Sequence, residues 1–122
     1  MMINKKTLVL GASPNADRYG YKATVMLLKH NYEVVPFGIK KGHIAGKQIL
    51  NELPNDTNFD TVTLYLGPQN QVEYYDYISM LKPKRVIFNP GTENTEWQQR
   101  LKNEGIQPLE ACTLVLLQTS QY

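Results

Sequence analysis

Blocks of apolar residues alternate with mixed stretches along the chain, and the apolar blocks predict short buried strands. A strand inside a parallel sheet is covered on both faces, so nearly every position in it is apolar. Such runs occupy residues 7–10, 32–37, 61–66 and 85–88, and a shorter one occupies 106–109. The pattern therefore predicts five strands.

Between these runs, apolar residues spaced three or four apart predict amphipathic helices. They occupy 19–30, 68–81 and 95–102. The first ends at Asn31, which tolerates the left-handed conformation of a helix cap, and Asn94 or Thr95 caps the third. A shorter helix is predicted around 47–52, and the apolar tail 111–117 is either a last strand or a packing helix.

Strands that alternate with helices predict parallel βαβ units with right-handed crossovers. The predicted fold class is α/β: a single Rossmann-like domain over residues 1–122, with three α/β/α layers around a five-stranded, mainly parallel sheet. The first four strands end at Gly11, Phe37, Leu66 and Phe88, each before a turn rich in Gly, Pro, Asn or Ser. Such sheets bind ligands beyond the carboxyl ends of their strands, so these four loops are predicted to converge on one site.

The first of these turns, from Gly11 to Gly20, has the composition of a phosphate-binding turn. A glycine between a strand and a helix brings free backbone N–H groups and the positive end of the helix dipole to one place. Ser13 offers a hydroxyl and Arg18 a guanidinium to phosphate oxygens, while Gly20 permits a close approach. The spacing does not match the G-x-G-x-x-G fingerprint. A βα turn without a ligand is the alternative.

The loop after the second strand bears on which nucleotide is bound. NAD-binding proteins usually place an acidic residue there to hold the ribose diol. This chain has Lys40 and Lys41 instead. Cations suit a ribose that carries a phosphate, which points to coenzyme A (CoA) or NADP, with a solvated lysine pair as the alternative. Pro36, inside the strand, predicts that the strand ends there or lacks one ladder hydrogen bond.

With these motifs, the sequence resembles the small CoA-binding domain family, the single-domain relatives of the N-terminal Rossmann domain of the succinyl-CoA synthetase α subunit. The resemblance covers residues 7–117. The motifs that carry it are Gly11-Ala12-Ser13 with Arg18 and Gly20, Val34-Val35-Pro36-Phe37-Gly38-Ile39, Asn89-Pro90-Gly91-Thr92-Glu93-Asn94 and Glu110-Ala111-Cys112-Thr113. At Gly38-Ile39 the chain departs from the family, which usually has Asn-Pro there.

The resemblance implies that CoA lies with its diphosphate over the turn from Gly11 to Gly20 and its adenosine near the second-strand loop. Ligase activity is not implied, because the phosphorylated histidine of the synthetases lies in a further domain. The predicted cofactor-binding residues are Gly11, Ala12, Ser13, Arg18, Gly20, Pro36, Lys40, Lys41, Asn89, Pro90 and Gly91.

Composition and charge narrow the class of protein. Apolar residues make up 42% of the chain and charged residues 20%, as in ordinary globular domains. A net charge of only +2 argues against a nucleic-acid surface. No apolar run approaches the roughly 18 residues that span a bilayer, and residues 1–6 lack the apolar core of a signal peptide. The single cysteine, Cys112, is typical of a cytoplasmic protein with reduced thiols.

The remaining polar residues predict neither a catalytic group nor a metal site. His30 lies at a helix end, His43 lies in a glycine loop, and Cys112 lies in an apolar tail where we expect it to be buried. Glu93 and Glu96 fit the first turn of a helix, where acids are common, although both also follow the fourth strand.

The leading hypothesis is therefore non-catalytic binding of CoA or an acyl-CoA, a small-molecule nucleotide ligand. The alternatives are an NADP-binding or acyl-CoA-handling enzyme and a ligand-free protein-interaction module. The chain is also rich in tyrosine, and a homodimer through Tyr74, Tyr77 and their neighbours is a further hypothesis.

Overall fold

The computed structural model describes residues 5–122, so most of the N-terminal stretch considered for a signal peptide lies outside the described residues. Five strands form one sheet in the order β2-β1-β5-β6-β7, and every neighbouring pair is parallel, which confirms the predicted sheet. They are β1 (Thr7–Leu10), β2 (Val34–Phe37), β5 (Thr61–Leu64), β6 (Arg85–Phe88) and β7 (Gln107–Glu110). The chain passes from β1 outward to β2 and then back to β5, so the strand order reverses between β1 and β5.

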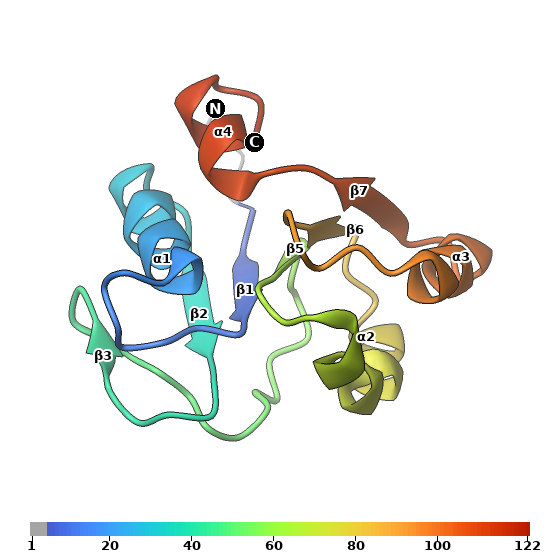
Figure 1. Ribbon diagram of the computed structural model, residues 1–122, viewed down its shortest axis with the longest axis horizontal. Helices are drawn as coiled ribbons and strands as arrows, with labels where there is room; N and C mark the ends of the chain where they lie inside the picture. The colour runs from blue at the N-terminus through green and yellow to red at the C-terminus, as the bar shows by residue number, and fades with distance from the viewer. Residues whose placement is uncertain (1–4) are drawn as a thin grey trace.

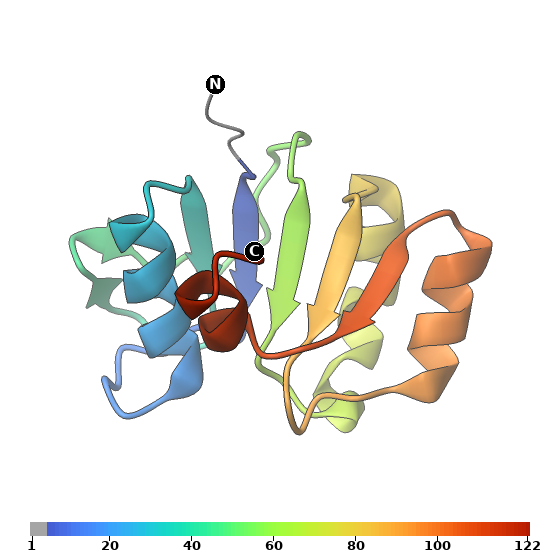
Figure 2. The same ribbon diagram turned by 90° about the horizontal axis from the view of Figure 1, so that it is seen from above.

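Helices cover both faces of the sheet, as predicted (Figure 1). On one face lie α1 (Tyr19–Lys29) and α4 (Thr113–Gln118), and on the other lie α2 (Tyr75–Leu81) and α3 (Thr95–Asn103). Figure 2 shows α1 and α4 side by side against the strands, and the two helices are in contact. The apolar tail predicted at 111–117 therefore forms a packing helix, α4, and not a last strand.

Alternate side chains of each strand fill the two layers between sheet and helices. Leu8 and Leu10 of β1 join the layer under α2 and α3, while Val9 joins the layer under α1 and α4. Trp97 of α3 is fully buried and stacks on Tyr75, with 4.6 Å between ring centroids. Each large apolar side chain buried in this way contributes roughly 1.5–3 kcal/mol. The core therefore lies on the faces of the sheet and leaves the strand ends to the loops.

Both edge strands contain a proline, Pro36 in β2 and Pro108 in β7. The Pro36 carbonyl accepts a hydrogen bond from Leu50 outside the sheet, so the Pro36 nitrogen also faces outward. In β7 the N–H groups of Gln107 and Ala111 donate toward β6, so the nitrogen of Pro108 between them faces away. Of the two alternatives predicted for Pro36, the strand does end here, because β2 ends at Phe37. Pro36 removes no bond from the ladder to β1, because β2 is an edge strand.

The predicted helix around 47–52 is wrong. That segment contains β4 (Lys47–Gln48), which pairs antiparallel with β3 (His43–Ile44). The turn between them places Ala45 and Gly46 at φ +49° and +83°. Two consecutive residues with positive φ fit the twist of a two-residue hairpin loop, so the turn geometry overrides the weak helical pattern.

The helix predicted over 68–81 begins as two 3₁₀ turns, η1 (Pro68–Asn70) and η2 (Val72–Tyr74), before α2. Asn31 adopts the predicted left-handed conformation after α1, with a φ of +65°, and α2 ends at Leu81 as predicted, before Lys82 at a φ of +51°. α1 and α3 end at Lys29 and Asn103, each one residue from the prediction. Three strands have boundaries that differ from the prediction. β2 begins at Val34 rather than at 32. β5 ends at Leu64 rather than at 66, and β7 begins at Gln107 and extends to Glu110.

Candidate functional site

An open pocket of about 730 Å³ lies beyond the carboxyl ends of the strands. It lies at the ends of the adjacent strands β1 and β5, where the connections leave toward opposite edges of the sheet. Parallel sheets bind ligands at such a place, and the pocket volume is in the range of small-molecule sites, roughly 300–1,000 Å³. The four loops predicted to converge all contribute to its wall. They supply 11–13 and 17–20 after β1, 37–40 after β2, 65–67, 70, 73 and 74 after β5, and 90–92 after β6.

Two glycines shape the turn after β1. Gly11 has a φ of +105°, and a Cβ there would lie 2.9 Å from the backbone carbonyl of Tyr65. Gly20, in the first turn of α1, faces back toward Gly11, and a Cβ on it would lie 2.7 Å from the Gly11 oxygen. A side chain at either position would force the backbone apart. The glycines therefore allow α1 to begin directly against the end of β1.

The N-terminus of α1 borders the pocket without a side-chain cap. Arg18 is the N-cap residue, and within residues 5–122 no side-chain hydrogen bond caps this end of the helix. Ser13 Oγ instead accepts from the N–H of Asn15 at 3.1 Å, and Asn15 Oδ1 accepts from the N–H of Asp17 at 2.9 Å. The first-turn N–H groups and the helix dipole can therefore act on an anion in the pocket.

The loop after β2 packs closely on the turn after β1. A Cβ on Gly38 would lie 2.1 Å from the Ala12 carbonyl oxygen, so the backbone approach requires glycine. Asn51 Nδ2 donates to the carbonyl oxygens of Gly38 at 2.8 Å and of Lys40 at 3.0 Å. These contacts fix the segment that carries Lys40 to the pocket wall.

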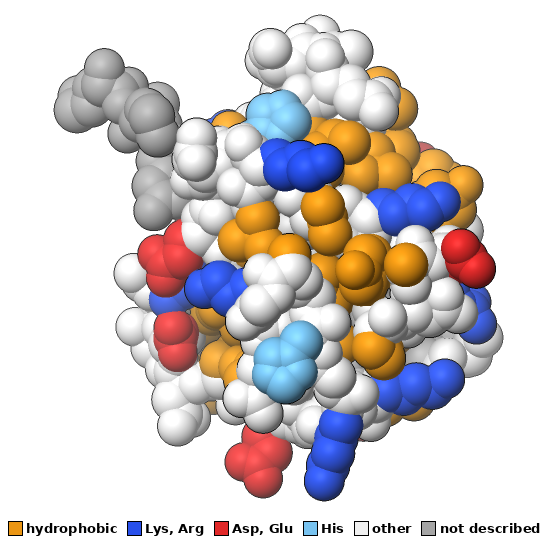
Figure 3. All heavy atoms as spheres, turned by 90° about the vertical axis from the view of Figure 1, so that its left-hand side faces the viewer, with side chains coloured by type: hydrophobic (Ala, Val, Ile, Leu, Met, Phe, Trp, Pro, Cys, Tyr) orange, Lys and Arg blue, Asp and Glu red, His pale blue; other side chains and the backbone are white. Residues whose placement is uncertain are grey.

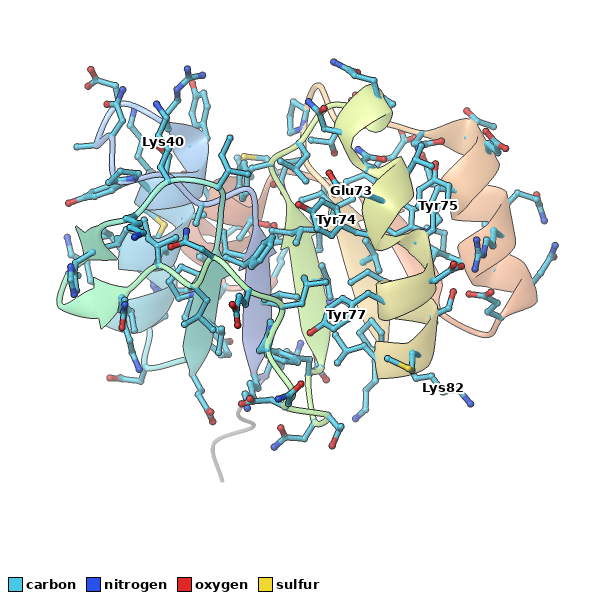
Figure 4. The ribbon with its side chains drawn as sticks, turned by 90° about the horizontal axis from the view of Figure 1, so that it is seen from below. Lys40, Glu73, Tyr74, Tyr75, Tyr77 and Lys82 are labelled. Atoms are coloured by element: carbon cyan, nitrogen blue, oxygen red, sulfur yellow. The ribbon has the colours of Figure 1, made fainter. Side chains whose placement is uncertain are left out.

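The walls of the pocket differ in charge. Arg18 and Lys40 lie on the side of β1 and β2, and neither forms an ion pair within residues 5–122. Asp17 lies beside Arg18 in the same turn. Glu73 lies on the other side of the pocket, in the segment that leads into α2, and Figure 4 shows it well separated from Lys40. The β1 and β2 side thus offers two unpaired cations to a ligand.

Gln71 joins the loops on the β5 and β6 side of the pocket. Its Nε2 donates to the carbonyl oxygens of Leu66 and Thr92, each at 2.8 Å, and its Oε1 accepts from Asn94 Nδ2 at 2.9 Å. The side chain is fully buried, and all of its polar groups have partners. Asn94 also caps α3, because its Oδ1 accepts from the N–H of Trp97, as one of the two predicted caps. This network holds residues 90–92 in the pocket wall.

Most of the predicted binding residues line the pocket, namely Gly11, Ala12, Ser13, Arg18, Gly20, Lys40, Pro90 and Gly91. Pro36, Lys41 and Asn89 are not part of its lining. Pro36 lies within β2, and Lys41 is exposed beside the pocket. The structure therefore separates two adjacent lysines that are equivalent in the sequence pattern.

Asn89 is buried beneath the pocket, with 2% of its surface exposed. Its Nδ2 donates to Thr63 Oγ1 at 2.7 Å and to the Leu64 carbonyl oxygen at 2.8 Å, and its Oδ1 accepts from the N–H of Thr113 at 2.9 Å. The side chain therefore ties the ends of β5 and β6 to the start of α4.

The sequence predicted that the loop after the third strand reaches the site, but it predicted no binding residue there. The residues of this wall are Tyr65, Leu66, Gly67, Asn70, Glu73 and Tyr74. Their position after the third strand is the available signal, but the pattern predicts a helix over 68–81, which hides the two 3₁₀ turns that place residues 70, 73 and 74 in the wall. Burial raises the pKa of Tyr65 to about 12. Burial, and then the nearby Glu73 carboxylate, raise the pKa of Tyr74. Both phenols therefore stay neutral at physiological pH.

The residues considered for catalysis are not part of the pocket lining. His30 and His43 are exposed, and Figure 3 shows histidine side chains on the surface of the face that carries α1 and β3. Cys112 precedes α4 and is half-buried, so the expectation of burial is wrong. Glu93 accepts a hydrogen bond from the N–H of Gly91 at 2.9 Å. Within residues 5–122, no three His, Cys, Asp or Glu side chains are grouped to hold a metal ion.

The two tyrosines considered for a dimer contact pack within the fold. Tyr74 is buried and lies edge-on to Phe37, with 5.7 Å between ring centroids. The Tyr77 hydroxyl donates to the Pro54 carbonyl oxygen at 2.9 Å. Figure 4 shows both side chains extending from the η2–α2 segment across the sheet. The homodimer stays a prediction.

Comparison with models of protein families identifies the family to which this chain belongs. A family model described as CoA binding domain matches residues 5–118, nearly the whole chain. The chain belongs to this CoA-binding domain family. The resemblance seen in the sequence motifs is thereby confirmed, and membership supports binding of a small molecule, CoA, by the domain. A search of curated proteins finds no match.

Solved structures share the fold. One described as the crystal structure of an uncharacterized protein is 52% identical, with a TM-score of 0.96 over 99% of this chain and 100% of its own. A hypothetical protein from Pyrococcus horikoshii OT3 is 25% identical, with a TM-score of 0.83 over 95% of this chain and 82% of its own. The dinucleotide-forming acetyl-coenzyme A synthetase 1 of Ca. Korarchaeum cryptofilum is 17% identical, with a TM-score of 0.70 over 87% of this chain and 25% of the synthetase. That last likeness shows the fold alone.

In the described residues, no helix combines the length and apolar character needed to cross a membrane.

Proposed function

We propose that this domain binds CoA or an acyl-CoA in the pocket, in the cytoplasm, and catalyses no reaction on it. The diphosphate lies over the turn from Gly11 to Gly20, and the phosphorylated ribose lies near Lys40. The observation that carries the proposal is the uncapped N-terminus of α1 beside Arg18 and Lys40, two cations without an ion pair in residues 5–122.

In this proposal each phosphate group of CoA has a binding partner in the pocket wall. The diphosphate accepts hydrogen bonds from the first-turn N–H groups of α1, and the guanidinium of Arg18 adds charge-assisted bonds. The 3′-phosphate of CoA lies on its ribose and suits a separate cation, which Lys40 supplies from the β2 loop. Family membership supports CoA rather than NADP as the nucleotide.

The chemistry of the pocket wall supports binding without catalysis. None of the described residues that line it is histidine or cysteine. The phenol of Tyr65 has a pKa near 12 because it is buried, far above the range useful for a general base at neutral pH. The wall therefore holds no matched set of nucleophile, base and orienting partner.

Isothermal titration calorimetry with CoA, dephospho-CoA and NADP tests the proposal. We expect CoA to bind most tightly, and dephospho-CoA about tenfold more weakly because one charge-assisted contact is lost. No binding of any of the three would overturn the proposal and favour an interaction module. Tighter binding of NADP would favour the NADP-binding alternative, and turnover of an acyl-CoA by the purified protein would overturn the non-catalytic role.

The adjacent lysines offer a matched pair of variants. Lys40 lines the pocket and Lys41 does not, so Lys40→Ala should weaken CoA binding about tenfold while Lys41→Ala changes it little. Binding of dephospho-CoA should respond to neither substitution. Equal effects of the two variants on CoA would show that Lys40 does not hold the 3′-phosphate.

A further inference from the structure

Charge is distributed unevenly between the two halves of the pocket. The half formed by the loops after β1 and β2 contains Asp17, Arg18 and Lys40. In the half formed by the loops after β5 and β6, Glu73 is the only charged side chain among the described lining residues. Figure 4 shows Lys40 on the β2 loop and Glu73 at the start of the α2 segment, on opposite sides of the sheet centre.

Glu73 is not neutralised by the fold. It is exposed, and within residues 5–122 it takes part in no ion pair or side-chain hydrogen bond. Asp76, in the next turn, is instead paired with Arg100 at 2.8 Å. The wall residues closest to Glu73 in the chain, Asn70 and Tyr74, carry no positive charge. Its negative field therefore acts on whatever occupies this half of the pocket.

The proposed placement of CoA determines which part of the ligand lies beside Glu73. The phosphorylated ribose lies at Lys40 and the diphosphate lies at the turn after β1, so the pantetheine arm continues toward the loops after β5 and β6. That arm is uncharged and ends in the thiol that carries an acyl group. Beyond the phosphates, the acyl group is therefore the only part of the ligand that can bring a charge to Glu73.

We propose that Glu73 makes the pocket selective for CoA thioesters with neutral or positively charged acyl groups and disfavours acyl groups that end in a carboxylate. The inference rests on the proposed CoA binding. A second carboxylate beside Glu73 is repelled, whereas a methyl group or an ammonium group is not. At a partly solvated site, repulsion between two unit charges changes affinity by roughly three- to tenfold.

Calorimetry with acetyl-CoA and succinyl-CoA tests this selectivity. We expect acetyl-CoA to bind roughly three- to tenfold more tightly, with the difference shrinking at about 0.5 M salt. Glu73→Gln should remove the preference by strengthening succinyl-CoA binding, and Glu73→Lys should reverse it. Glu96→Gln is the matched control, because Glu96 is exposed in α3 and does not line the pocket; it should retain the preference.

Titrations with unacylated CoA distinguish failure of the selectivity inference from failure of the proposed CoA binding. If CoA binds but the two thioesters bind equally, or if the preference survives in Glu73→Gln, the inference is overturned and the proposed function stands. If neither CoA nor a thioester binds, the proposed function fails and the inference fails with it. Thermal unfolding of each variant checks that the exposed substitutions leave the fold intact.

Discussion

Two glycines of the pocket wall, Gly38 and Gly67, face different neighbours and should respond differently to a methyl group. At 38 the nearest atom to a new Cβ is the Ala12 carbonyl oxygen at 2.1 Å, whereas at 67 it belongs to the flexible Gln69 side chain at 3.0 Å. Gly38→Ala should lower the free energy of unfolding by about 3 kcal/mol because backbone must move, and Gly67→Ala by less than about 1 kcal/mol. Urea denaturation measures both; equal costs would contradict the close packing of the β2 loop.

The buried amide of Asn89 gives a second prediction for a single residue. Asn89→Ala leaves the Leu64 carbonyl and the Thr113 N–H without their partner, so we expect a loss of about 2–4 kcal/mol in the free energy of unfolding. Asn103→Ala, at an exposed position, serves as control and should change it by less than about 0.5 kcal/mol. A stable Asn89→Ala protein that binds CoA poorly would instead indicate direct contact with the ligand.

The sequence identified one half of the pocket wall much better than the other. The turn after β1 has a local signal, because glycines and a basic residue between a strand and a helix indicate phosphate binding. Glu73 has no such signal, since its place in the wall depends on the two 3₁₀ turns that precede α2. Asn89 and Lys41 were predicted as binding residues from residue type and position in a loop, which do not reveal which way a side chain points, and neither lines the pocket.

At the scale of elements, Gln71 connects the loops after β5 and β6. Gln71→Met keeps the approximate size but removes the donors to Leu66 and Thr92, and we expect a loss of about 2–4 kcal/mol in stability. Hydrogen exchange should also become faster in residues 90–94. The exposed Gln69→Met should show neither effect. Unchanged exchange in 90–94 would contradict the role of Gln71 in holding the wall.

The strands and helices that the sequence predicted correctly are those whose pattern follows from burial. Residues 8–10 of β1 and 86–88 of β6 are apolar and buried because both faces of the sheet are covered, and Trp97 and Leu101 lie four residues apart on the buried side of α3. The β3–β4 hairpin was missed because its turn, Ala45-Gly46, lacks the Asn-Gly or Asp-Gly signature.

At the scale of the whole molecule, buried tyrosines should make the fold sensitive to alkali. Burial raises the pKa of Tyr65 from 10.0 to about 12 and also raises that of Tyr122. Between pH 10 and 12 the unfolded chain loses the Tyr65 proton while the folded protein keeps it, so stability is full below pH 10 and falls as pH rises through this window.

Urea denaturation at a series of pH values measures this dependence. Tyr65→Phe removes one of the responsible groups and should flatten the decline above pH 10. The control is Tyr19→Phe, because Tyr19 is 63% exposed, and it should leave the decline as it is. An identical pH dependence in the Tyr65 variant would show that this phenol ionises equally in both states.

The outward-facing nitrogens of Pro36 and Pro108 limit how copies of this domain can associate. A strand that joins a sheet edge needs N–H donors at alternate residues, and each edge of this sheet lacks one of them. On β2, Leu50 already occupies the Pro36 carbonyl. Edge-to-edge pairing of copies, and with it growth into fibrils, is therefore opposed at both sides of the five-stranded sheet.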